Sequence, residues 1–155
     1  MVPRPLRSLT MATPSAPARK TRKDFQRLAD LRAREAATLA KAGKQHGAYY
    51  LGGFAVECAL KACIARQTRR HDFPGDVGFA RSVHTHDLNE LLKLARLNDQ
   101  LDKDIKTKPQ LGANWGVVKS WKVDSRYETV GLNGRDMVAA VNSSDGVLEW
   151  IRLYW

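Results

Sequence analysis

A short basic and aromatic segment of the chain carries the side-chain types that contact nucleic acids. Arg126 and Tyr127 are adjacent in "SRYE", after two tryptophans and close to Lys119 and Lys122. The guanidinium group of arginine can form paired hydrogen bonds to a phosphate, and an aromatic ring can stack on a base. This segment is therefore the best candidate for contact with a nucleotide or RNA. The structural alternative is an arginine that ties its loop to the rest of the domain.

A charged pair lies within the most apolar stretch of the chain, "AYYLGGFAVECALKACIARQ". Glu57 and Lys61 are spaced i, i+4 with the acid first, which is the better orientation for an ion pair on a helix. We predict a partly buried structural ion pair that also includes Arg32, from the apolar face of the preceding helix. The alternative is that Lys61 belongs to a ligand site.

Histidines and carboxylates gather on both sides of a glycine-containing segment near the middle of the chain. His71, Asp72, His84, His86 and Asp87 are of the types that bind metal ions. Their spacing matches no metal-binding signature, so we predict no metal site. His86 and Asp87 fit the start of a helix instead, where His84 and His86 can face a phosphate.

Helical periodicity dominates the sequence, and no segment alternates strictly as a half-buried strand does. Between helices we expect a long loop over 69–86, a polar connector with at most a helical turn over 98–108, and a turn-rich loop over 124–134. The second helix has two apolar stripes and should be central. The sequence therefore predicts an all-α bundle, with helices over 24–43, from 48 to 67, over 86–97, from 109 to 123, and from 137 to 155, the last divided at "NSSDG".

The excess of basic residues is concentrated at the N-terminus. The chain holds 26 lysines and arginines against 16 aspartates and glutamates, which gives a net charge of +10. Residues 1–23 contain no acidic residue and few large apolar side chains. Such a segment cannot bury enough apolar surface to offset its ordering entropy, so we expect a disordered basic tail over 1–23. One helical domain should follow over 24–155.

The composition also favours a cytoplasmic protein with no membrane contact. No segment has the features of a secretory signal, and none offers about 18 uninterrupted apolar residues for a membrane span. Cys58 and Cys63 are the only cysteines, and on a helix they would point about 140° apart. They therefore cannot pair with each other. We predict that both are small buried side chains in a reducing compartment.

Four segments, taken in order, resemble the HEPN family of small helical domains. They are "AYYLGGFAVECALKACIA", "THDLNELLKLA", "SRY" and a final amphipathic helix that contains "WI". The similarity covers the chain from about Phe25 to Trp155. It implies an up-and-down bundle of four or five helices that is frequently a homodimer and is often encoded beside a minimal nucleotidyltransferase. No cofactor is expected.

The resemblance also defines where a catalytic motif would lie. Ribonuclease members of the family carry an arginine, a spacer of about four to six residues and a histidine, late in the domain, where the two groups act on the phosphate and 2′-hydroxyl of RNA. Here the late arginine is Arg126, and no histidine follows it. Arg66 and His71 match the spacing, but they lie at the end of the second helix. The alternative for that pair is a solvated basic helix end that favours the helix dipole.

From the residues and the resemblance together, we expect a module that binds nucleotide or RNA and works with a nucleotidyltransferase or in a toxin–antitoxin or defence system. Its homodimer would form through helix faces. One alternative is a metal-independent endoribonuclease toxin that uses the Arg–His pair of the second helix. Another is a structural protein-interaction module with a basic surface. The expected binding residues are Arg126, Tyr127, Lys61, His86 and Lys122.

Overall fold

The computed structural model describes residues 20–70 and 82–155, so most of the expected tail and of the expected loop over 69–86 lies outside the described residues. Among the described residues there is no β-strand, and the all-α prediction is confirmed. The elements are α1 (Arg22–Lys41), α2 (Gln45–Arg70), α4 (Leu88–Leu94), α5 (Asn98–Thr107), α6 (Pro109–Val118), the 3₁₀ helix η1 (Val123–Tyr127), α7 (Gly134–Asn142) and α8 (Val147–Ile151).

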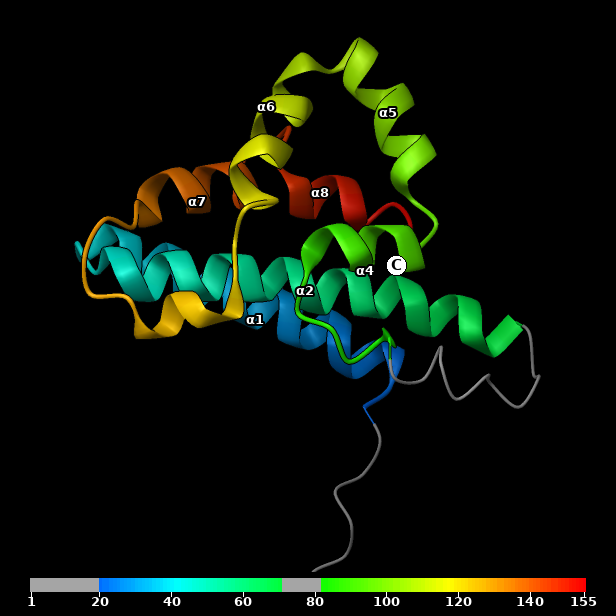
Figure 1. Ribbon diagram of the computed structural model, residues 1–155, viewed down its shortest axis with the longest axis horizontal. Coiled ribbons are helices and arrows are strands. Elements are labelled where there is room, and N and C mark those ends of the chain that lie inside the picture. The colour runs from blue at the N-terminus through cyan, green and yellow to red at the C-terminus, as the bar shows by residue number, and fades with distance from the viewer. Residues whose placement is uncertain (1–19, 71–81) are drawn as a thin grey trace, which may run out of the picture.

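α2 is the central helix, and most of the other elements pack against it (Figure 1). α1 runs antiparallel to α2, and α7 packs across both helices. α5 and α6 form a hairpin that stands away from α2, and it contacts α7 through α6 and α8 through both helices. α4 and η1 both contact α2. The segments that carry the candidate binding residues therefore lie against one long helix.

α1 begins where the sequence provides a cap. The Thr21 hydroxyl accepts a hydrogen bond from the backbone N–H of Asp24, and the Asp24 carboxylate accepts one from the backbone N–H of Thr21. This capping box starts the helix at Arg22, within the segment that the sequence predicts to be tail. A row of four buried alanines lies along α1. Their small side chains allow α1 to approach α2 closely.

α2 is covered on both of its apolar stripes, as predicted. Gly53 allows Trp121 to pack directly on the helix, because an added Cβ would lie only 2.2 Å from the indole Cδ1 atom. Gln45–Thr68 is long and apolar enough to cross a membrane by length and composition, which the sequence analysis did not anticipate. However, 67% of its apolar window is buried inside the fold. Its hydropathy is thus accounted for by its place in the core.

α5 is a ten-residue helix where the sequence predicts a polar connector, so that prediction is wrong. Leu101 is buried and Ile105, one turn later, packs against the core. Asp104 accepts hydrogen bonds from Trp150 Nε1 at 2.7 Å and from the Tyr154 hydroxyl at 3.3 Å. Contacts with distant residues stabilise this helix, since its own sequence is short and polar.

The C-terminal segment is divided into two helices as expected, and a 3₁₀ helix precedes them. α7 and α8 are separate helices with a break over 143–146, which confirms the division at "NSSDG". Gly146 permits this turn, because an added Cβ would lie 2.5 Å from the Val141 carbonyl oxygen. The 3₁₀ helix η1 begins just ahead of the segment that the sequence predicts to be a turn-rich loop.

Candidate functional site

Four side chains of α2 follow one line on its surface, which we call the α2 strip: Tyr50, Phe54, Glu57 and Lys61. Their steps of four, three and four residues keep them on one face of the helix. Tyr50 stacks on Phe54, with ring centroids 6.1 Å apart, and on Trp121, at 6.0 Å. The strip thus changes from aromatic to charged over about 16 Å of helix.

Glu57 is the buried centre of the charged end of the strip. Its side chain is 2% exposed. The Oε1 atom accepts a hydrogen bond from Lys61 Nζ at 2.8 Å and lies 2.9 Å from Nδ1 of His86. The Oε2 atom is also buried and has no hydrogen-bond partner among the described residues. The fold therefore places two of the predicted binding residues, Lys61 and His86, on one shared carboxylate.

His86 is oriented by this contact and by the start of α4. An ionised carboxylate can only accept hydrogen bonds, so Nδ1 of His86 donates to Glu57. The next residue, Asp87, caps α4 by accepting hydrogen bonds from the backbone N–H groups of Asn89 and Glu90. The His86 side chain is 52% exposed, and its Nε2 atom makes no hydrogen bond to any described residue. That nitrogen is available to a ligand.

Arg32 lies beside the strip but outside the Glu57 ion pair, which corrects the sequence-based prediction. Its Nη1 atom donates to Glu35 Oε2 at 2.6 Å, on the same helix. The guanidinium group lies 6.0 Å from the centroid of the Phe54 ring. Arg32 thus pairs with a carboxylate three residues away on α1, and Glu57 pairs with Lys61 and His86.

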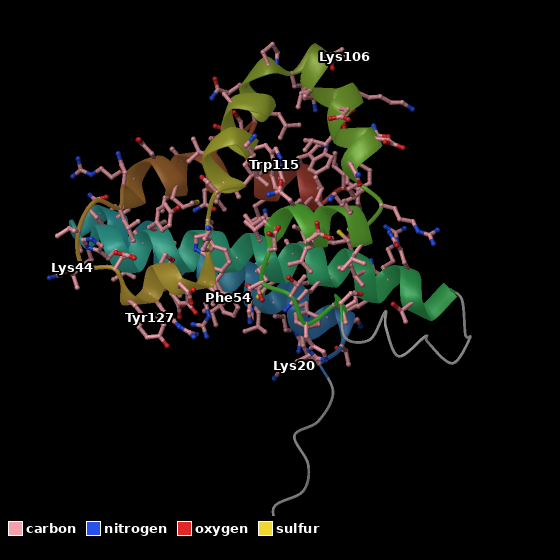
Figure 2. The ribbon with its side chains drawn as sticks, in the orientation of Figure 1. Lys20, Lys44, Phe54, Lys106, Trp115 and Tyr127 are labelled. Atoms are coloured by element: carbon pink, nitrogen blue, oxygen red, sulfur yellow. The ribbon has the colours of Figure 1, made fainter. Side chains whose placement is uncertain are left out.

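η1 supplies an exposed arginine and tyrosine next to the aromatic end of the strip. The Arg126 guanidinium lies 4.9 Å from the centroid of the Tyr127 ring, and Tyr127 is 72% exposed. The pKa of Arg126 is raised, chiefly by Tyr127 and to a smaller extent by Tyr50. η1, which carries Arg126, packs against α2. Figure 2 shows Phe54 and Tyr127 on the same side of α2.

A hydrogen bond connects α4, which follows His86, to the segment that leads into η1 and Arg126. The Asn89 side chain on α4 donates to the Lys119 carbonyl oxygen, just after α6, at 3.3 Å. Trp121 then packs on α2, and the exposed Lys122 precedes η1. Lys122 thus directly follows Trp121, which stacks on Tyr50 of the strip, and its side chain forms no ion pair with any described residue.

Arg66 has a structural partner at the end of α2. Its Nη1 atom donates to the Tyr154 carbonyl oxygen at 3.1 Å, which ties α2 to the C-terminal segment. His71, its proposed catalytic partner, lies outside the described residues. The contacts of Arg66 therefore match those of a structural arginine.

The cysteines and the acidic residues show no metal chemistry in the described part of the chain. Cys58 and Cys63 are both buried free thiols, and burial raises the pKa of each to about 12. They remain protonated at neutral pH and are poor nucleophiles and metal ligands in that form. Across residues 20–70 and 82–155, no group of three His, Cys, Asp or Glu side chains is arranged to hold a metal ion.

Two features of the site go beyond the sequence-based prediction. The spacing places Tyr50 and Phe54 beside Glu57 and Lys61 on one helix, but it does not give the first feature, the stacking of Tyr50 on Trp121. The second is the contact between His86 and Glu57, which are 29 residues apart. No local spacing encodes that contact, because it depends on how α4 docks on α2.

Comparison with known proteins gives no assignment. No protein-family model matches the chain, and neither a curated protein nor a solved structure shows significant similarity to it. The resemblance to HEPN domains therefore stays a prediction from the sequence, and the function must be argued from the strip and η1.

Proposed function

We propose that this protein is a HEPN-like module that binds a nucleotide or RNA along the α2 strip and η1. In this proposal bases stack on the aromatic end, and phosphates contact the cationic side chains beside it. The module acts as a homodimer with a nucleotidyltransferase or in a toxin–antitoxin or defence system, as the resemblance implies. Light scattering tests the dimer, since a mass of 17.4 kDa would identify a monomer.

The observation that carries the proposal is the exposed pairing of Arg126 with Tyr127. A large aromatic ring that is 72% exposed is free to stack on a base. The guanidinium 4.9 Å from its centroid can bind the phosphate that accompanies that base. Tyr50 and Phe54 extend the aromatic surface along α2, so the stacking surface is larger than one ring.

The charges along the strip and η1 balance when His86 is neutral and are net positive when it is protonated. The cations Arg32, Lys61, Lys122 and Arg126 stand against the carboxylates Glu35, Glu57, Asp124 and Glu128. The sum is 0 with His86 neutral and +1 with it protonated. Phosphate groups that contact the four cations would release bound counterions. Association with RNA should consequently weaken as salt rises.

The test is the affinity of Arg126→Ala and Tyr127→Ala for a single-stranded oligonucleotide, measured by fluorescence anisotropy. Each substitution should weaken binding by about tenfold, since stacking of a base on an aromatic ring contributes about 1–3 kcal/mol. Both side chains are exposed, so the fold should be retained in circular dichroism.

Lys103→Ala is the matched control, because Lys103 is exposed on α5, an element that packs chiefly against α6. It removes one positive charge without touching the strip. Unchanged affinity in Arg126→Ala and Tyr127→Ala, or an equal loss in Lys103→Ala, would contradict the proposed site. Cleavage of the oligonucleotide by the wild type would instead favour the endoribonuclease alternative.

A further inference from the structure

The charged end of the α2 strip holds two groups that still have capacity to bind an anion. Lys61 has three N–H donors, and Glu57 accepts one of them. His86 donates to Glu57 through Nδ1, and its Nε2 atom is not bonded to any described residue. Both donors contact the same carboxylate oxygen, so Lys61 and His86 lie beside one another at this end of the strip.

The protonation of His86 changes what this cluster offers to a ligand. With a neutral imidazole the charges of Lys61 and Glu57 cancel, and Nε2 presents a lone pair that repels a phosphate oxygen. With an imidazolium the cluster carries +1, and Nε2 becomes a donor directed at the ligand. One proton therefore changes both the net charge and the hydrogen-bonding role of the same exposed atom.

The buried carboxylate of Glu57 is an independent reason to expect a second positive charge beside it, in addition to Lys61. Glu57 is 2% exposed, and its Oε2 atom is buried without a partner among the described residues. A buried carboxylate with one unsatisfied oxygen is costly, and full positive charge beside its other oxygen lowers that cost. The geometry thus favours a ligand that keeps His86 in its charged form.

We propose that this end of the strip is a proton-coupled phosphate subsite, in which a phosphate group of the ligand binds Nε2 of protonated His86 and the free N–H groups of Lys61. The inference rests on the proposed function and adds a second phosphate contact, at the charged end of the strip, together with what controls its affinity. The base of the same ligand lies toward Tyr50, about 10 Å along the helix from Glu57.

The charged groups near this cluster come from α1, from the start of α4 and from the end of α6. On α1, Arg32 and Glu35 are paired with each other. Asp87, the next residue, is engaged by backbone N–H groups of α4. Lys119 lies close to α4 through the contact of its carbonyl oxygen with Asn89. Among these side-chain types, only imidazole ordinarily changes its charge between about pH 5 and pH 8.

The test is the affinity for a short oligouridylate without terminal phosphates, measured by anisotropy at fixed ionic strength between about pH 5.5 and pH 8. The phosphodiester groups of this probe keep their charge throughout that range. Uptake of one proton on binding should make the wild type bind more tightly at low pH, by up to about tenfold per pH unit.

Three substitutions separate His86 from other sources of pH dependence. His86→Gln should bind with one affinity at every pH, near the wild-type value at high pH. His86→Lys, which keeps a positive charge over this range, should bind at the tighter level throughout. His84→Gln should keep the wild-type slope, because His84 is exposed two residues away and has no contact with Glu57. Circular dichroism checks the fold of each variant.

The outcomes separate this inference from the proposed function. Binding whose pH slope is unchanged in His86→Gln would overturn the phosphate subsite and leave the nucleotide-binding proposal in place. The same would hold if His84→Gln abolished the slope. Absence of binding by the wild type at every pH would overturn the proposed function, and the subsite with it.

Discussion

The contribution of an ion pair to stability depends on its burial, and this chain contains two pairs that differ mainly in that respect. Lys61 Nζ is 2.8 Å from Glu57, with side chains 15% and 2% exposed. Lys93 Nζ is 3.0 Å from Glu90, with side chains 60% and 55% exposed. Water screens the exposed pair, whereas loss of Lys61 leaves the buried Glu57 carboxylate with the His86 imidazole as its one partner among the described residues.

We therefore expect Lys61→Ala to lower the free energy of unfolding by about 2–4 kcal/mol. Lys93→Ala, which removes the same side chain from an exposed pair, should change it by no more than about 0.5 kcal/mol. Urea denaturation followed by circular dichroism measures both. Equal losses in the two variants would show that Glu57 does not depend on Lys61.

At this scale the sequence predicts contacts within a helix better than contacts between helices. The spacing of Glu57 and Lys61 encodes their proximity once the helix is recognised. The same rule explains why Arg32 pairs with Glu35, three residues away, rather than with α2. The contact of His86 with Glu57 depends on the docking of α4, which no local pattern specifies. The sequence therefore predicts the contact of Glu57 with Lys61 but not its contact with His86.

Among the helices, the packing of Trp121 on α2 has a strict steric requirement. A Cβ at Gly53 would lie 2.2 Å from Trp121 Cδ1, whereas a Cβ at Gly116 on α6 would meet nothing within 4 Å. Gly53→Ala should lower the free energy of unfolding by about 1–3 kcal/mol through overpacking, despite the better helix propensity of alanine. Gly116→Ala should raise it by up to about 1 kcal/mol.

Thermal denaturation of the two glycine variants gives the comparison directly. Because Trp121 also stacks on Tyr50, Gly53→Ala should in addition weaken oligonucleotide binding at the aromatic end of the strip. A stabilised Gly53→Ala protein with normal binding would mean that the indole can move away from α2 at no cost.

The carboxylate of Asp104 holds α5 to the C-terminal segment, and its pKa is lowered. The hydrogen bond from Trp150 is the main cause, with smaller contributions from Gln100 and Tyr154. A lowered pKa in the folded state stabilises the protein above the ordinary range of aspartate, about pH 4, and this stability is lost as the pH falls through the lowered value.

Asp104→Asn should accordingly lower the melting temperature at pH 7, and the difference from the wild type should shrink as the pH is lowered below about 4. Asp102→Asn, an exposed position on the same helix, serves as the control and should show a smaller effect at both pH values. A difference that stays constant across this range would indicate that Asp104 contributes through shape rather than charge.

These tertiary hydrogen bonds also explain why the sequence predicts the long helices but not α5. The long helices α1 and α2 have strong apolar periodicity, and the break between α7 and α8 follows turn-forming residues. α5 has only Leu101 and Ile105 facing the core, and its fixed position comes from contacts with Trp150 and Tyr154. A segment stabilised by residues about 50 positions later resembles a polar linker when it is considered alone.

For the molecule as a whole, general positive charge and a specific site make different predictions about RNA binding. The chain carries +10, of which the three arginines before residue 20 contribute +3, leaving +7 on the rest. Charge alone attracts any polyanion with strong salt dependence. The proposed stacking on Tyr127 and the proposed hydrogen bond at His86 would instead be short-range contacts that depend on the folded domain.

Replacement of Arg4, Arg7 and Arg19 by glutamine in the full chain separates the two contributions. Three lost phosphate contacts would reduce the slope of log affinity against log salt by at most about 2. We expect a change within that limit, while Arg126→Ala still weakens binding by about tenfold in the substituted background. Binding that disappears with the three arginines, and no longer responds to Arg126→Ala, would assign RNA association to the N-terminal charge and remove the α2 strip from it.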